Sequence, residues 1–109
     1  MKPMPGVQIT LVSDVSEAPY SGMLPGHIAG FYTHEEAHID LRKLCVFAGA
    51  RFVHATVVGM DPGAREVFIE GRAPLSFDLV SINIGSTPSW GGVPGAAEFA
   101  TPSKPVPEL

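Results

Sequence analysis

The sequence predicts an α/β domain in which buried parallel strands alternate with one main helix and a small antiparallel β-meander. Three observations lead to this fold class. The segment Val7–Asp14 is almost wholly apolar or β-branched, as in strands buried on both faces of a parallel sheet. One apolar stripe of helical period follows it. Two strand-like segments joined by a DPGA turn come next, which is the alternation expected of an α/β domain.

The main helix is expected over residues 34–48, after a loop whose Pro and Gly content excludes a long helix. Thr33 is a good N-cap, Glu36 completes a capping box, and Gly49 is a natural stop. Asp40 is an alternative cap for a second, separate helix. The apolar stripe consists of Ala37, Leu41, Leu44, Cys45 and Ala48.

Further strands are expected downstream of the helix. The segment Ala50–Asp61 has the alternating pattern of a strand. Residues 65–71, "REVFIEG", are expected to form the next strand after the turn. The segment Leu75–Gly85 contains a short strand and then a buried one, Leu79–Ile84. After Gly85 the sequence has five prolines beyond Thr87 and no periodicity, so residues 89–109 are expected to be a connector.

Composition limits the functional classes. The 109 residues are 45% hydrophobic and 17% charged, which is typical of one globular domain. The net charge of −4 argues against nucleic-acid binding. No apolar run approaches the roughly 20 residues of a transmembrane helix, and the first residues lack the apolar core of a signal peptide. Since the single Cys45 requires no oxidising compartment, a cytoplasmic location is expected.

One short motif suggests zinc chemistry. Residues 34–38 match H-E-x-x-H, in which two histidines one helical turn apart hold zinc and the glutamate serves as base. Here the match falls in the first turn of the expected helix, where polar residues are favoured by capping and by the helix dipole. Neither His27 nor His54 is placed to suggest a third ligand. The motif is therefore interpreted as a capped, solvated helix start, and no metal is expected.

Three stretches, in this order and spacing, resemble one family. They are "PYSGMLPGHIAGFY" after the first strand, "ARFVHATVVGMDPGAREVFIEG", and "FDLVSINIGSTP". Together they are similar to the FAD-dependent pyridine nucleotide–disulfide oxidoreductases, in particular the type II NADH dehydrogenase-like branch. The resemblance implies a doubly wound, Rossmann-like FAD-binding domain over residues 1–88, followed by a connector toward an NAD-binding domain.

The resemblance also shows what this chain does not contain. The family opens with a strand, a G-x-G-x-x-G turn and a helix that hold the FAD pyrophosphate. Only six residues precede Val7–Asp14, which matches the family's second strand. The chain is therefore expected to be an interior fragment, a truncated FAD-binding domain. The first strand is central in this fold, so Val7–Asp14 and Leu79–Ile84 are expected to have unpaired edges that either pair together or join a second copy.

The resemblance implies candidate cofactor-binding residues on the adenosine side. Ser13 matches the acid that bonds the adenosine ribose, with Asp14 next to it; a turn-starting role for Asp14 is an equal alternative. Val57 matches the position whose backbone reads the adenine edge. Asn83 and Gly85 fall in the family's A-T-G motif, where the glycine allows close approach of the cofactor.

On the flavin side, the resemblance places Ser21, Met23 and Leu24 nearest the ring. An ordinary surface loop without a binding role explains the same composition equally well. Cys45 has no second cysteine with which to form a redox disulfide, which favours direct electron transfer from the flavin. The implied parent protein takes hydride from NAD(P)H and passes electrons to a quinone or similar small-molecule acceptor. The fragment alone is expected to be inactive, and the alternative is a non-catalytic α/β interaction module that has lost the cofactor.

Overall fold

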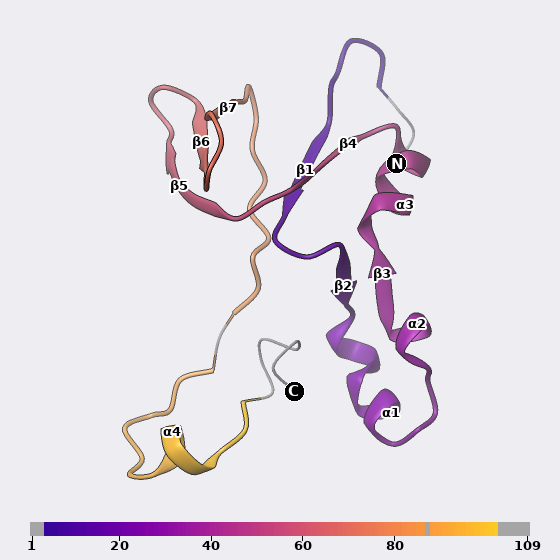
Figure 1. Ribbon diagram of the computed structural model, residues 1–109, viewed down its shortest axis with the longest axis vertical. Helices are drawn as coiled ribbons and strands as arrows, with labels where there is room; N and C mark the ends of the chain where they lie inside the picture. Colours follow the sequence, from indigo (N-terminus) through magenta and orange to yellow (C-terminus); the bar gives the residue numbers. More distant parts are fainter. Residues whose placement is uncertain (1–3, 87, 103–109) are drawn as a thin grey trace.

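The computed structural model describes residues 4–86 and 88–102 (Figure 1). Strands and helices alternate in the first half of the chain, and strands follow in a meander. The strands are β1 (Thr10–Ser13), β2 (Glu17–Pro19), β3 (His38–Asp40), β4 (Arg51–His54), β5 (Val57–Asp61), β6 (Glu66–Ile69) and β7 (Leu75–Ser76). The helices are η1 (Ser21–Met23), α1 (Leu24–Ile28), α2 (His34–Ala37), α3 (Leu41–Ala48) and α4 (Ala96–Phe99).

Three small sheets organise the described residues. β1 and β4 form a parallel pair, with Thr10 opposite Arg51 and Ser13 opposite His54. β2 and β3 pair in antiparallel fashion, and β5, β6 and β7 form an antiparallel meander. In Figure 1 the β1–β4 pair lies between the meander on one side and, on the other, the β2–β3 pair with the helices that connect its two strands. The mixture of a parallel pair, one main helix and a small meander agrees with the predicted α/β class.

The region predicted as one helix over 34–48 is instead divided into three elements. Thr33 Oγ1 accepts a hydrogen bond from the Glu36 amide, and Glu36 accepts one from the Thr33 amide, so the predicted capping box is present. The helix ends after Ala37 because residues 38–40 extend to pair with β2. The alternative prediction, that Asp40 caps a separate helix, is confirmed: Asp40 precedes α3 and its side chain accepts a hydrogen bond from the Lys43 amide. Gly49, with a φ of 66°, follows the last residue of α3.

Other boundaries also differ from prediction. The expected strand Ala50–Asp61 is broken at residues 55–56, where the chain leaves the parallel pair and enters the meander. Within the expected loop, Glu17–Pro19 forms β2 because β3 supplies a partner. The first strand is four residues long rather than the eight of Val7–Asp14.

The predicted strand Leu79–Ile84 is wrong for this structure. No described residue pairs with it, and Leu79 and Ile84 are 87% and 90% exposed. The expected pairing of this segment with Val7–Asp14 is also absent, because β1 pairs with β4 alone among the described strands. In the predicted connector 89–109, residues 96–99 form the short helix α4. Residues 103–109 of the connector lie outside the described part of the chain. So do residues 1–3 and 87 of the predicted domain 1–88.

The core is small. Among the described residues the buried apolar side chains are Ala37, Leu41, Cys45, Val53 and Ile69. Three of them lie on the predicted stripe, whereas Leu44 of the same stripe is 45% exposed. The radius of gyration is 17.1 Å, against roughly 13 Å for a compact domain of this length. Much of the apolar surface therefore faces solvent.

The capping box gives a stability prediction. Thr33→Ala removes the acceptor for the Glu36 amide and is expected to lower the free energy of unfolding by about 1 kcal/mol. Urea denaturation followed by circular dichroism measures the change. Thr33→Ser keeps the hydroxyl and is expected to stay within a few tenths of a kcal/mol of the parent chain. Equal losses in the two variants would show that the hydroxyl is not what stabilises this turn.

Candidate functional site

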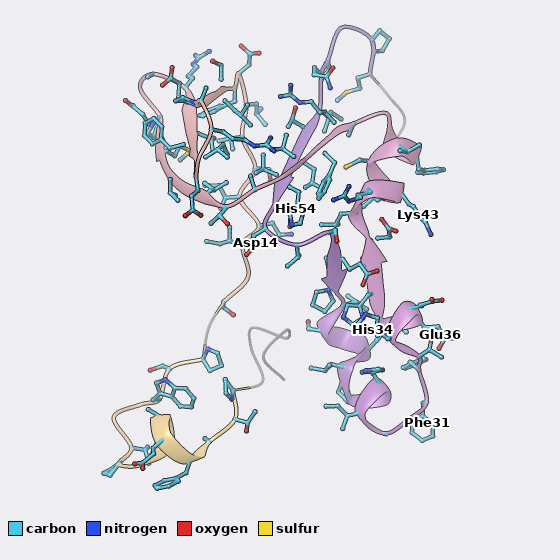
Figure 2. The ribbon with its side chains drawn as sticks, in the orientation of Figure 1. Asp14, Phe31, His34, Glu36, Lys43 and His54 are labelled. Carbon is cyan, nitrogen blue, oxygen red and sulfur yellow. The ribbon has the colours of Figure 1, made fainter. Side chains whose placement is uncertain are left out.

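The carboxyl ends of β1 and β4 meet at one edge of the parallel pair. Asp14 directly follows β1, and His54 is the last residue of β4. Figure 2 shows the two residues next to each other at this edge, and the His54 Nε2 lies 2.9 Å from the Asp14 carbonyl oxygen. Since a carbonyl oxygen only accepts, Nε2 carries the proton and donates. Ligands of open α/β sheets bind outside the carboxyl ends of the strands, so this edge is the first place to look for a site.

A shallow cavity of about 370 Å³, wide open to solvent, lies at this edge. Its lining comes from the end of β1, the link between β4 and β5, and the residues that follow β6. The lining residues are Asp14, His54, Ala55, Thr56, Glu70 and Arg72. The Glu70 amide donates to the Thr56 carbonyl at 3.0 Å and so holds the meander against the β4–β5 link. Carboxylates, a hydroxyl and a guanidinium in one cavity suit a ligand rich in hydroxyl groups.

A second cavity, of about 400 Å³, adjoins the same two residues toward the β2–β3 hairpin. Asp14 and His54 line both cavities, so they form the wall between them. The other lining residues of the second cavity are Val15, Ser16, Glu17, Pro19, His34 and His38. Of the predicted site residues, Asp14 alone lines either cavity.

The histidines of the H-E-x-x-H match are not arranged as zinc ligands. α2 ends at Ala37, so His34 and His38 do not share a continuous helix. Their rings stack at 3.7 Å with an interplanar angle of 15°. His34 Nε2 lies 3.2 Å from a Glu17 carboxylate oxygen, and His38 Nδ1 lies 2.7 Å from the His34 carbonyl oxygen. In residues 4–86 and 88–102, no three His, Cys, Asp or Glu side chains group closely enough to hold a metal ion.

Of the five predicted adenosine-side residues, Ser13 and Asp14 lie at the β1–β4 edge. Ser13 and Asp14 are consecutive there, and the Ser13 Oγ accepts from the Val15 amide at 3.3 Å. Val57 begins β5 immediately after Thr56, which lines the first cavity, and is 47% exposed. Ser13 and Asp14 therefore lie together at this edge, whereas Val57 follows a lining residue along the chain but lines neither cavity.

The remaining predicted residues lie elsewhere. Ser21 and Met23 are in η1, and Leu24 begins α1, away from both cavities' linings. Asn83 and Gly85 lie in the unpaired segment after β7. Gly85 has a φ of 74°, and a side chain added to it meets nothing within 4 Å among the described residues. Its backbone therefore stands open, although no group approaches it in this structure.

Five lining residues of the first cavity were not predicted from the sequence, and three of them are ionisable: His54, Glu70 and Arg72. His54 could have been predicted from the sequence, because it lies at the carboxyl end of a strand, as Asp14 does, and ligands bind at that end of parallel strands. Glu70 and Arg72 had no such signal, since they reach the site only through the fold of the meander. Cys45, a member of the predicted apolar stripe, is buried, with 4% of its surface exposed.

No family model matches this chain, and no curated protein matches its sequence. One solved structure to which the chain is similar is the sulfide:quinone oxidoreductase from the hyperthermophilic bacterium Aquifex aeolicus, with a TM-score of 0.62 and 24% sequence identity. The match covers 69% of this chain and 18% of that one, so this chain spans less than a fifth of that protein's length. The likeness confirms the predicted fold class, a truncated Rossmann-like α/β unit.

A separate observation concerns membranes. Each helix in residues 4–86 and 88–102 is too short or too polar to cross a lipid bilayer.

Proposed function

We propose that this chain supplies the adenosine side of an FAD-dependent oxidoreductase, in which electrons pass from NAD(P)H to a quinone or a similar small acceptor. The observation that carries the proposal is the position of Asp14 and its cavity at the carboxyl edge of the β1–β4 pair. The fold likeness to a quinone oxidoreductase supports it. Within the proposal, residues 1–88 are part of the FAD-binding domain and 89–109 lead toward an NAD-binding domain. The proposed setting is the cytoplasm.

The residues of the first cavity fit the adenosine half of FAD by their chemistry. The Asp14 carboxylate accepts hydrogen bonds from ribose hydroxyls, with the neighbouring Ser13 as a weaker partner. The backbone of Val57 serves the adenine edge. Arg72 offers donors to an anionic or carbonyl group. Asp14 and Arg72 line the first cavity, and Ser13 and Val57 are sequence neighbours of lining residues.

The flavin, when bound, supplies the hydride and electron chemistry. In this proposal Ser21, Met23 and Leu24 border the ring. The open backbone at Gly85, with Asn83 two residues before it, allows the cofactor to approach closely. The glycine-rich turn that holds the pyrophosphate is no part of these 109 residues. For this reason we propose that the chain is inactive by itself.

The DNA upstream of Met1 tests this function. An in-frame strand followed by G-x-G-x-x-G is expected, and the longer polypeptide is expected to purify yellow and show flavin absorbance that the 109-residue chain lacks. Oxidation of NADH and of NADPH by the longer polypeptide, with a soluble quinone as acceptor, then identifies the donor. A colourless longer polypeptide that adds no flavin on reconstitution would contradict the proposal.

A second candidate function is a non-catalytic interaction module. The observation in its favour is the unpaired segment Leu79–Ile84, whose apolar side chains stand in solvent. This candidate predicts no G-x-G-x-x-G upstream and no flavin in any form of the protein. The same DNA and absorbance measurements therefore separate the two functions.

A further inference from the structure

One side-chain contact extends the parallel β1–β4 pair beyond its last backbone bond. The ladder ends where Ser13 lies opposite His54 and the Ala55 amide donates to the Ser13 carbonyl at 2.9 Å. The next carbonyl along the chain, that of Asp14, accepts from the His54 Nε2 at 2.9 Å, and Figure 2 shows these two residues side by side. His54 therefore holds the first peptide group that the ladder leaves free.

The His54 ring is itself supported by its own strand. Phe52 and His54 are two residues apart on β4, so their side chains share one face. Their ring centroids are 6.1 Å apart with an interplanar angle of 30°. The Arg42 guanidinium carbon lies 5.6 Å from the centroid of the Phe52 ring, which places a further side chain on this face. A donor on a supported ring loses less freedom when it binds than a donor on an unsupported side chain.

The backbone around Asp14 is held on both sides of the residue. Before it, the Ser13 carbonyl is bonded to the Ala55 amide, and after it the Val15 amide donates to the Ser13 Oγ at 3.3 Å. The Asp14 carboxylate lines both cavities and makes no hydrogen bond or ion pair within the described part of the chain. Its direction therefore depends on the backbone that His54 helps to hold.

We propose that His54 is a positioning residue of the adenosine site: by holding the Asp14 peptide group, it directs the Asp14 carboxylate toward the ribose hydroxyls. The role rests on the proposed function, in which Asp14 is the ribose partner. Hydrogen bonds weaken steeply as their angle departs from linear, so an acceptor on an unsteady backbone binds a hydroxyl less well. His54 performs this role as an imidazole with a proton on Nε2, because a carbonyl oxygen only accepts.

The first measurement needs no ligand. The nitrogen-15 chemical shifts of the imidazoles, recorded on the 109-residue chain at about pH 8, where histidine is largely neutral, report which ring nitrogen carries the proton. The expected result for His54 is a proton on Nε2. A proton on Nδ1 instead would leave Nε2 unable to donate to the Asp14 carbonyl, and would overturn the proposal whatever the chain binds.

Titration of the same chain with adenosine tests the positioning. His54→Phe keeps a ring beside Phe52 but removes the donor, and is expected to weaken adenosine binding about fivefold. His54→Gln, whose side-chain amide nitrogen can replace Nε2 as the donor, is expected to stay within about twofold of the parent chain. A role in packing alone would give the reverse order, because Phe keeps the ring and Gln does not. Both variants are expected to match the parent chain by circular dichroism, since His54 is exposed.

A double-mutant cycle shows whether His54 acts through Asp14. Asp14→Asn is expected to weaken adenosine binding about tenfold in the parent chain, but only about twofold when His54→Phe is already present. Additive losses would show that His54 acts independently of Asp14 and would overturn the proposal, as would a His54→Phe variant that binds adenosine like the parent chain. Those outcomes leave the proposed function standing. A parent chain that binds no adenosine would contradict the proposed function, and the role of His54 with it.

Discussion

Leu41→Ala is expected to lower the free energy of unfolding by about 3 kcal/mol and so to leave the chain largely unfolded at 25 °C. Leu41 begins α3 and is one of only five buried apolar side chains in the described residues. Removing its branched end leaves a cavity that this small core has few atoms to fill. A chain that buries so little has a small stability margin, and a loss of this size takes most of it. Urea denaturation with far-ultraviolet circular dichroism measures the loss.

Leu44→Ala is the matched control for this substitution. Leu44 lies on the same helix, three residues further on, and is 45% exposed. The same atoms are removed, but only part of their surface is buried, so the expected loss is below about 1 kcal/mol. If the two variants lost equal stability, the burial of Leu41 would not be what holds α3 in place.

Asp14→Asn is expected to weaken the binding of adenosine about tenfold, which corresponds to roughly 1.4 kcal/mol. The carboxylate offers charge-assisted hydrogen bonds to ribose hydroxyls, and the isosteric amide offers only neutral ones. Titration of the 109-residue chain with adenosine, followed by the amide chemical shifts of Asp14, His54 and Thr56, reports binding at the cavity that these residues line. The adenosine probe needs only the part of the site that this chain contains.

Glu35→Gln serves as the control for Asp14→Asn. It makes the same change of charge on exposed α2, outside the linings of both cavities. Its adenosine affinity is expected to equal that of the parent chain. Adenosine shifts that appear away from the β1–β4 edge, or an equal effect of both substitutions, would contradict the role of Asp14.

Local signals in the sequence predicted the helix ends well. Thr33, Asp40 and Gly49 all act at the positions that capping rules assign them. The break between α2 and α3 was harder to foresee, because β3 is only three residues long and exists through its pairing with β2. Tertiary pairing therefore overrode the helical period over residues 38–40.

At Leu79–Ile84 the sequence predicted a strand that the structure does not form. The apolar, β-branched sequence has the local preference of a strand, but a strand also needs a neighbour. No described segment supplies one, so the preference is not expressed. In the candidate site, the resemblance named Ser13 with Asp14 next to it as candidates, and Asp14 lines the cavity, whereas Glu70 and Arg72 reach it through the fold of the meander. Composition and spacing carry no information about that approach.

The parallel pair has a consequence for synthesis. Thr10 and Arg51 are partners although 41 positions separate them, so β1 cannot pair until β4 has been translated. At about 5–20 residues per second, the ribosome takes roughly 2–8 s to supply that partner. During this interval β1 has no β4 partner, so its apolar side chains and unpaired backbone groups are open to chaperones or to aggregation.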